Sequence, residues 1–314
     1  MRTVFLGTPE LAVPSLAALA AKHEVAAVVC QPDRPAGRNR KPAPPPVKQW
    51  AQAHGIPVHQ PRKLNDGRFA EWLRDQGPEV CAIAAYGRLL KQPILDIPPH
   101  GFINMHPSLL PRHRGPSPIQ TAVLEGDAVT GVTIMRLILE MDAGDIILQE
   151  EAPIHDNDTT GTLAARLAEL GGRMLAQAVD RIEAGTATFT PQDHGKATYT
   201  RMFQKEDGRI RWTEPAWRIQ NLIRASNPWP VAHCCFRGQV CRIHRATTPG
   251  GDGAGSETAA PGKILACAKD GIAVATGEGR LLLQELQMPG KKVLGAAEFI
   301  RGQRVEPGAR FEEV

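Results

Sequence analysis

The sequence predicts an α/β protein built on a doubly wound, mostly parallel sheet, with a second, smaller β-barrel domain. Three observations predict this fold class. The chain opens with a strand–helix–strand pattern, a long amphipathic helix runs through its middle, and short apolar runs separated by turns follow later. A strand–helix–strand unit favours a parallel sheet with a right-handed crossover, whereas short strands between turns favour a barrel.

The chain has 314 residues, of which 42% are hydrophobic, and this is enough for two hydrophobic cores. Its net charge of +4 permits an anionic partner without requiring one. No apolar run approaches the roughly 18 residues that a membrane helix needs, and the chain reaches Gly7 too early for a signal peptide. The 6 cysteines contain no C-x-x-C pair. We therefore expect a cytoplasmic protein with no membrane segment and no metal.

The first part of the chain supplies the strands and helices of the parallel sheet. Apolar runs at 2–6, 24–30 and 79–85 predict strands, and 101–106 predicts a further strand that runs directly into polar groups. The turn after the first strand has Gly7 but no G-x-G-x-x-G, so we reject a dinucleotide site and interpret Gly7 as a tight strand-to-helix turn. Amphipathic or alanine- and leucine-rich runs predict four helices: 10–22, 47–54, 67–76 and 116–125.

The middle of the chain predicts an antiparallel pair and one long helix. Residues 130–137 are rich in β-branched side chains, and 146–154 can return beside them as a second strand. Residues 159–185 form the clearest helix, with threonines at its start, apolar residues along one side and Gly185 as a stop. These elements complete the sheet that we expect, which is Rossmann-like and mostly parallel.

Residues 31–48 form a basic, proline-rich segment. We expect no regular element there, because proline fixes φ and removes a donor. A long loop of this kind in a compact domain is usually functional or disordered. A basic, flexible loop that orders on binding suits a phosphate backbone, but an ordinary solvated surface loop explains the composition equally well.

The pattern changes after the long helix. Residues 189–205 show no clear period, so we expect a linker between a first domain at 1–188 and a second domain at 206–314. In the second domain a helix at 215–225 precedes five strand-like runs: 232–237, 239–246, 262–267, 271–276 and 280–286. Five short strands predict a small OB-like barrel, a fold that can bind nucleic acid. An ordinary soluble barrel with surface cations is the alternative.

The strand at 101–106 ends in Asn104 and His106, which point to the same face because they lie two residues apart. Ligands of parallel sheets bind outside the carboxyl ends of the strands, so this strand delivers both side chains to that crevice. The later loop carrying Asp142 can bring an acid back over the histidine. Alone, His106 would more readily be a packed histidine, and Asp142 a turn residue beside Gly144. Together, Asn104, His106 and Asp142 predict a catalytic site.

Several motifs resemble those of the 10-formyltetrahydrofolate-dependent formyltransferases, and the resemblance covers essentially the whole chain. The segments Asn104-x-His-x-Ser-Leu-Leu-Pro and Asp142-x-Gly-Asp are similar to motifs of that wider family. The loop Gln31-Pro-Asp-Arg-Pro-Ala-Gly-Arg and the segment Asn227-Pro-Trp-Pro resemble the methionyl-tRNA formyltransferases within it. His113 stands where that family usually has tryptophan.

The resemblance implies that a formyl group moves from 10-formyltetrahydrofolate, a co-substrate, to the free amino group of methionine on initiator tRNA, before translation begins. It implies a cytoplasmic monomer. It implies a folate pocket lined by four consecutive residues: Ser108, Leu109, Leu110 and Pro111. It implies tRNA contacts from the basic loop: Arg38, Arg40 and Lys41.

The chemistry of that reaction fits the three candidate catalytic residues. An amine attacks only when neutral, and its attack on a formyl group gives a tetrahedral oxyanion. Asn104 can donate an N–H to the oxyanion, and His106 can act as general base or proton shuttle. Asp142 can orient His106 and favour its protonated form. Ser108 is not expected to be a nucleophile, because it lacks a G-x-S-x-G elbow.

Two other functions remain open at this point. A sugar-nucleotide or small-amine N-formyltransferase would share the same core, but it would not need the basic loop or a cationic barrel. A non-enzymatic RNA-binding module would need those cations, but it would not need Asn104, His106 and Asp142.

Overall fold

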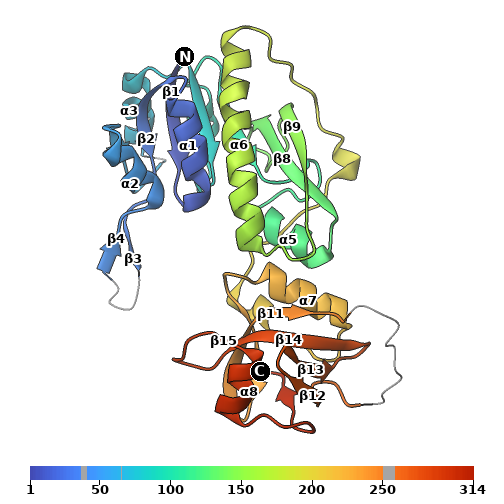
Figure 1. Ribbon diagram of the computed structural model, residues 1–314. Helices are drawn as coiled ribbons and strands as arrows, with labels where there is room; N and C mark the ends of the chain where they lie inside the picture. The colour runs from blue at the N-terminus through green and yellow to red at the C-terminus, as the bar shows by residue number, and fades with distance from the viewer. Residues whose placement is uncertain (37–40, 65, 250–258) are drawn as a thin grey trace. The chain divides into compact units, whose positions relative to one another are not determined.

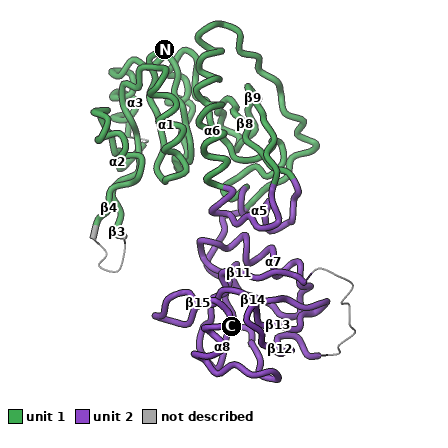
Figure 2. Tube along the Cα trace, in the orientation of Figure 1, with its two compact units in different colours: residues 1–118, 129–153, 164–200 green, residues 119–128, 154–163, 201–314 purple. Residues whose placement is uncertain are grey.

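The computed structural model describes residues 1–36, 41–64, 66–249 and 259–314. By their contacts these residues divide into two compact units, which Figure 2 colours separately. The ranges are 1–118, 129–153 and 164–200 for unit 1, and 119–128, 154–163 and 201–314 for unit 2. The domain boundaries expected at 188 and 205 stay a prediction.

Unit 1 is built on a seven-stranded sheet (Figure 1). In order across the sheet the strands are β5 (Val58–His59), β2 (Glu24–Val29), β1 (Arg2–Gly7), β6 (Val80–Ala84), β7 (Phe102–His106), β8 (Val129–Arg136) and β9 (Ile146–Pro153). Neighbours from β5 to β7 pair in parallel, whereas β8 and β9 run antiparallel to the strands beside them. The expected fold class, a mostly parallel Rossmann-like sheet, is confirmed.

Burial explains why the parallel strands are continuous apolar runs. All five residues of β6 are buried, as expected for a central strand that is covered on both faces. The buried core on one side of the sheet combines residues of β1, β6 and the helix at 68–76. Its members include Val4, Leu6, Cys81, Ile83, Phe69 and Leu73.

The helices from residue 10 to residue 183 lie where the sequence predicts them, except that the short helix α4 was not predicted. Their bounds are η1 (Glu10–Ala12), α1 (Val13–Ala20), α2 (Pro46–Ala53), α3 (Arg68–Gln76), α4 (Gln92–Leu95), α5 (Pro118–Glu125) and α6 (Thr160–Glu183). Two glycines let α6 approach its neighbours closely. A Cβ added at Gly172 would lie 2.7 Å from the carbonyl oxygen of Pro14 in α1, and one at Gly171 would lie 2.7 Å from Cγ of Met105 in β7. The sequence of α6 therefore fixes its contact with α1 and with the strand that carries the candidate site.

One prediction for residues 31–48 was wrong. We expected no regular element there, but the strands β3 (Arg34–Ala36) and β4 (Lys41–Ala43) form a two-stranded antiparallel ribbon. Pro35 and Pro42 face each other in this ribbon. The fixed φ of proline is compatible with an extended edge strand, and a ribbon of two strands leaves positions whose N–H is not needed for pairing. Arg38 and Arg40 lie outside the described residues.

Unit 2 contains an antiparallel sheet that closes on itself. Its strands in order are β12 (Ile264–Ala268), β13 (Gly271–Ala275), β14 (Arg280–Gln287), β11 (Gln239–Thr247), β10 (Ala232–Phe236) and β16 (Phe311–Glu312), and β15 (Leu294–Gly295) pairs with β14. Backbone bonds join its two ends: Ile264 N donates to Ala309 O at 2.8 Å, and Phe311 N donates to Gly262 O at 2.9 Å. This closure confirms the OB-like barrel.

A single apolar core fills the barrel. Strand β10 alternates buried and half-buried residues, which is the pattern of a strand with one inward face. Helices α7 (Ala216–Ala225) and α8 (Ala296–Gln303) cover the barrel, and α8 was not predicted from the sequence. Among the residues that the structure describes, no helix has both the length and the apolar character that a bilayer crossing requires.

Candidate active site

Strand β7 carries Asn104 and His106 at the place where the parallel part of the sheet ends. Its neighbour β6 is parallel and its neighbour β8 is antiparallel, so the carboxyl end of β7 lies at the change of direction. His106 is 5% exposed and lies opposite Thr133, whereas Asn104 is half-buried and lies opposite Met135. Because the two residues are two apart on one strand, they present their side chains to the same face, as predicted.

The segment after β7 is held down by hydrogen bonds to β8 and β9. The hydroxyl of Thr133 donates to the carbonyl of Ser108 at 2.7 Å and accepts from the N–H of Leu110 at 3.2 Å. The side-chain amide of Gln149 donates to the carbonyl of Leu110 at 2.9 Å and to the Thr133 hydroxyl at 2.8 Å. Residues 108–111 therefore have a fixed backbone, as a preformed ligand wall requires.

The loop between β8 and β9 brings Asp142 to His106. Its Oδ2 lies 3.6 Å from Nδ1 of His106 and accepts a hydrogen bond from the N–H of Gly115 at 2.7 Å. Asp142 has φ of 50°, in the left-handed region that few side chains adopt. The structure thus brings together the imidazole and the carboxylate that the sequence predicts as partners.

The hydrogen bonds of His106 define which nitrogen titrates. Nε2 lies 3.0 Å from the carbonyl oxygen of His113, and a carbonyl can only accept, so Nε2 carries a proton. Nδ1, which faces the Asp142 carboxylate, is therefore the nitrogen that gains or loses the second proton. Sequence reasoning missed this partner, because it is a backbone carbonyl rather than a side chain.

Burial sets the protonation state of His106. It lowers the pKa of His106 below its ordinary value, while the Asp142 carboxylate and the hydrogen bond to His113 raise it, and the positive charge that His113 can carry lowers it. Burial is the largest of these effects. A lowered pKa leaves the imidazole neutral at pH 7, with Nδ1 open to accept a proton. A proton that arrives there lies beside a carboxylate, which stabilises the imidazolium.

Residues 198–200, which lie within the linker expected at 189–205, pair with the loop that follows β7. Arg114 N donates to the carbonyl of Thr198 at 2.9 Å, and Thr200 N donates to the carbonyl of Arg114 at 2.7 Å. The N–H of His113 donates to the hydroxyl of Thr198 at 2.8 Å. The run Thr198-Tyr-Thr is typical of an extended strand, and it is the signal from which this pairing could have been predicted.

The structure leaves the predicted tRNA contacts unplaced. Arg38 and Arg40 lie outside the described residues, and Lys41 is placed only as the first residue of β4. Their role stays a prediction from the sequence.

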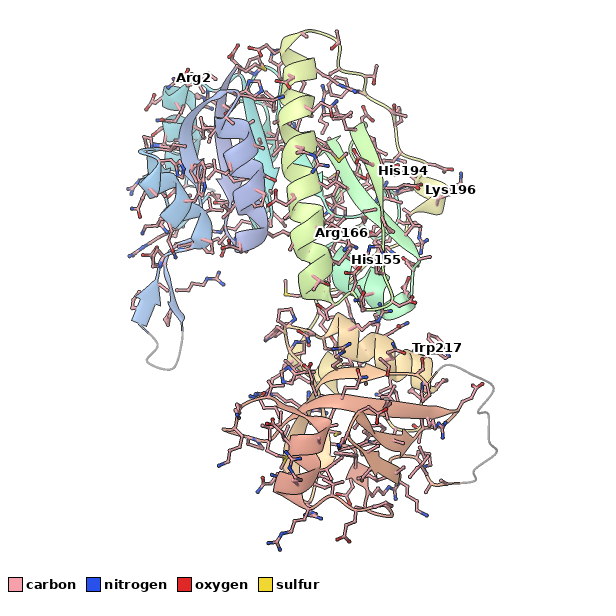
Figure 3. All side chains as sticks on the ribbon, viewed as in Figure 1. Arg2, His155, Arg166, His194, Lys196 and Trp217 are labelled. Carbon is pink, nitrogen blue, oxygen red and sulfur yellow. The ribbon has the colours of Figure 1, made fainter. Side chains whose placement is uncertain are left out.

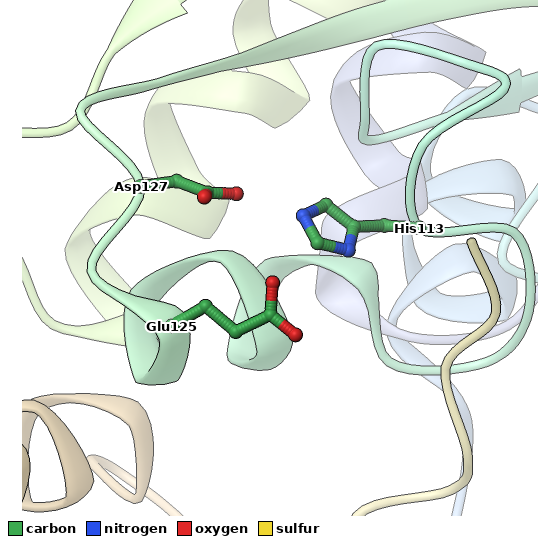
Figure 4. A group of neighbouring side chains, drawn as sticks. All are labelled: His113, Glu125 and Asp127. Carbon is green, nitrogen blue, oxygen red and sulfur yellow. The ribbon is translucent and has the colours of Figure 1, made fainter. Parts of the chain in front are cut away.

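Figure 4 shows three side chains of metal-ligating type: His113, Glu125 and Asp127. The expectation of a metal-free protein stays a prediction.

Comparisons with known proteins agree with this architecture. Residues 1–179 match the family model "Formyl transferase", and residues 202–304 match "Formyl transferase, C-terminal domain". The chain is 46% identical over 311 residues to the methionyl-tRNA formyltransferase of Moorella thermoacetica, covering 98% of both chains. It is 45% identical to the methionyl-tRNA formyltransferase of Roseiflexus castenholzii, covering 99% of both.

Solved structures share the fold at lower identity. The sugar 3N-formyl transferase WlaRD superposes with a TM-score of 0.65 at 17% identity, over 93% of this chain and 99% of that one. HypX from Aquifex aeolicus in complex with tetrahydrofolic acid superposes with a TM-score of 0.65 at 18% identity, over 96% of this chain and 47% of that one. At these identities the two structures support the fold alone.

Proposed function

The chain belongs to the methionyl-tRNA formyltransferase family, and from this premise we propose that it transfers the formyl group of 10-formyltetrahydrofolate to the free amino group of methionine on initiator tRNA. The observation that carries the proposal is the similarity over both units, at 46% identity across 98% of the chain. A sugar-nucleotide or small-amine formyltransferase remains the alternative, and its representative WlaRD is only 17% identical. The product would enter translation initiation.

We propose that His106 acts as general base through Nδ1. The neutral amine attacks the formyl carbon, a C–N bond forms, and the amine nitrogen releases a proton to Nδ1. The bond from the formyl carbon to N10 of the folate then breaks, and the imidazolium returns the proton to N10. Base and acid catalysis by one well-placed histidine typically contributes a factor of about 10² to 10⁴.

Asn104 and Asp142 stabilise the charges that appear during this sequence. An amide N–H of Asn104 donates to the oxyanion of the tetrahedral intermediate, an interaction of about 3 kcal/mol in comparable sites. The Asp142 carboxylate, 3.6 Å from Nδ1 of His106, stabilises the imidazolium. Both charges are transient, so both side chains act more strongly in the transition state than on the bound substrates.

Residues Ser108, Leu109, Leu110 and Pro111 are proposed to line the folate site. Their support is the network of Thr133 and Gln149, which fixes this backbone beside His106. A fixed wall reduces the entropy lost when the folate binds. The family implies a folate co-substrate, and the protein is proposed to work as a cytoplasmic monomer without a metal.

Substrate choice and salt dependence test the proposed function. We expect rapid formylation of methionyl-tRNA with 10-formyltetrahydrofolate, and very slow formylation of free methionine methyl ester or a nucleotide-linked amino sugar. Binding that uses three or more phosphate contacts should raise KM for methionyl-tRNA about ten- to a hundredfold between about 50 and 200 mM salt, because bound counterions are released. Rapid formylation of the amino sugar with a salt-insensitive KM would instead favour the alternative function.

Arg38→Ala tests the proposed tRNA contact of the basic loop. Loss of one phosphate contact should raise KM for methionyl-tRNA about fivefold and reduce the slope of log KM against log salt by about 1. KM for the folate should stay the same. Arg74→Ala, which removes an exposed cation from α3, is the control. Unchanged tRNA kinetics in Arg38→Ala would mean that the loop is ordinary surface.

A further inference from the structure

In unit 1, Gln192 lies between the loop that carries Asp142 and the loop that carries Arg114. It is 5% exposed, and its side-chain nitrogen Nε2 donates to the carbonyl oxygens of Asp142 at 2.9 Å and of Gly144 at 2.8 Å. These two bonds use both N–H groups of one amide. The backbone of the loop that carries Asp142 is thus held from outside by a residue 50 positions further along the chain.

Arg114 fixes the orientation of the Gln192 amide. Its guanidinium is fully buried, and Nε and Nη2 donate to Oε1 of Gln192 at 3.1 and 2.7 Å. With Oε1 held by the cation, Nε2 must face the loop, so the amide cannot rotate by half a turn. Nη1 of Arg114 lies 3.6 Å from a carboxylate oxygen of Glu140, which places a counter-charge on the same loop.

The 3-10 turn η2 (His194–Lys196) begins two residues after Gln192 and lies on the outer side of unit 1, where Figure 3 labels His194 and Lys196. Nδ1 of His194 lies 3.8 Å from Glu140 and 3.4 Å from the Arg114 guanidinium. This turn therefore closes the group around Arg114 from the solvent side. Because η2 is close to Gln192 in the chain, these contacts of His194 help to hold Gln192 in place.

The loop conformation needs such support. Asp142 holds φ at 50°, which costs about 1 kcal/mol or more for a residue with a side chain. A Cβ at Gly144 would lie only 1.9 Å from the carbonyl oxygen of Arg136, so the backbone passes very close to the end of β8. A backbone held in an uncommon region keeps that conformation only where its surroundings determine it.

We propose that Gln192 is a positioning residue, which sets the place of the Asp142 carboxylate relative to His106 by holding the backbone carbonyls of Asp142 and Gly144. This inference rests on the catalytic role proposed above for Asp142. Gln192 acts through the loop, because its hydrogen bonds go to the loop backbone and to Arg114. Arg114 has the supporting role of orienting the clamp.

Gln192→Met is the first test, because methionine has nearly the same length and carries no hydrogen-bonding amide or charge. We expect kcat to fall about ten- to a hundredfold, as a displacement of about 1 Å in a catalytic group can cause. KM for the folate should change less than twofold. Gln76→Met in α3, a half-buried glutamine, is the control and should leave kcat unchanged.

Proton NMR titration of His106 gives a readout that is independent of activity. The groups that face its ring and influence its pKa are Asp142 and His113, and the Asp142 carboxylate raises that pKa. If the carboxylate moves away, the pKa of His106 should fall in Gln192→Met, in the same direction as in Asp142→Asn. In an Asp142→Asn background, Gln192→Met should cause no further shift, since the charge it positions is already gone.

Two outcomes would overturn the proposal: an unchanged pKa of His106 in folded Gln192→Met, or an equal shift in the Asp142→Asn background. If Gln192→Met does not fold, Gln192→Glu replaces it, because a carboxylate still accepts from Arg114 but cannot donate to the loop. Gln192→Glu should lower kcat at least about tenfold, by the same displacement of Asp142, and unchanged kcat would overturn the proposal. If the titration behaves as expected while the wild-type protein fails to formylate methionyl-tRNA, the proposed function fails and the positioning stands.

Discussion

Asp142→Asn is expected to lower kcat about a thousandfold while the protein stays folded, because the variant removes the charge that stabilises the His106 imidazolium. Asparagine keeps the size of the side chain, and its carbonyl oxygen can still accept from the N–H of Gly115. It also tolerates the left-handed backbone that Asp142 adopts. The measurement is the initial rate at saturating methionyl-tRNA and folate, with the melting temperature as the check on folding.

The pH dependence of Asp142→Asn follows from the same geometry. The Asp142 carboxylate raises the pKa of His106, so its loss should lower that pKa further below the ordinary histidine value. The base form of His106 would then persist to lower pH, and the acid limb of kcat should move to lower pH while the plateau falls. Asp145→Asn removes an equal charge from the same loop and should have a much smaller effect. Near-normal turnover in Asp142→Asn would remove Asp142 from the mechanism.

Periodicity in the sequence was sufficient for most of the fold. The antiparallel pair β8 and β9, the long helix α6 and the strands of the barrel all lie within a few residues of the predicted positions. Each of these elements is specified by its own burial pattern, because a strand or helix with one buried face must repeat apolar residues at its own period. The polar end of β7 was also predictable, because Asn104 and His106 interrupt a run of apolar residues.

The missed features depend on contacts that periodicity does not record. The ribbon of β3 and β4 was missed because proline was treated as incompatible with any strand, although it is tolerated where a strand has no second neighbour. The role of Gln192 depends on hydrogen bonds to backbone carbonyls of a distant loop. Any residue supplies a carbonyl, so the identity of the partner residue contains no signal for such a bond.

The tautomer of His106 shows the same limit inside the candidate site. The sequence placed an acid near a histidine, and this favoured the view that Asp142 orients the ring. In the structure the carbonyl of His113 fixes Nε2 of the ring, and Asp142 faces the nitrogen that titrates. In this position the carboxylate raises the pKa of His106, which agrees with the expectation that it favours the protonated form, and its orienting role stays a prediction.

His106→Gln is expected to lower kcat about a thousandfold, because the variant has no group that can accept a proton from the attacking amine near neutral pH. Glutamine can still donate an N–H to the carbonyl of His113, so the loop contact is kept and the melting temperature should change little. His100→Gln, an exposed histidine in the turn that precedes β7, removes one titrating group without touching the site and is the control.

The pH profiles of kcat distinguish the role of His106 as a base from the role of the Asp142 charge. In His106→Gln the acid limb of kcat that belongs to the imidazole should disappear, whereas in Asp142→Asn it should move to lower pH. The limb that belongs to the substrate amine appears in the kcat/KM profile of every variant, because that group is free in solution. An acid limb of kcat that is the same in His106→Gln as in the wild-type protein would assign it to another group. His106 would then bind or orient the substrates, and the proton would have to leave the amine by another route.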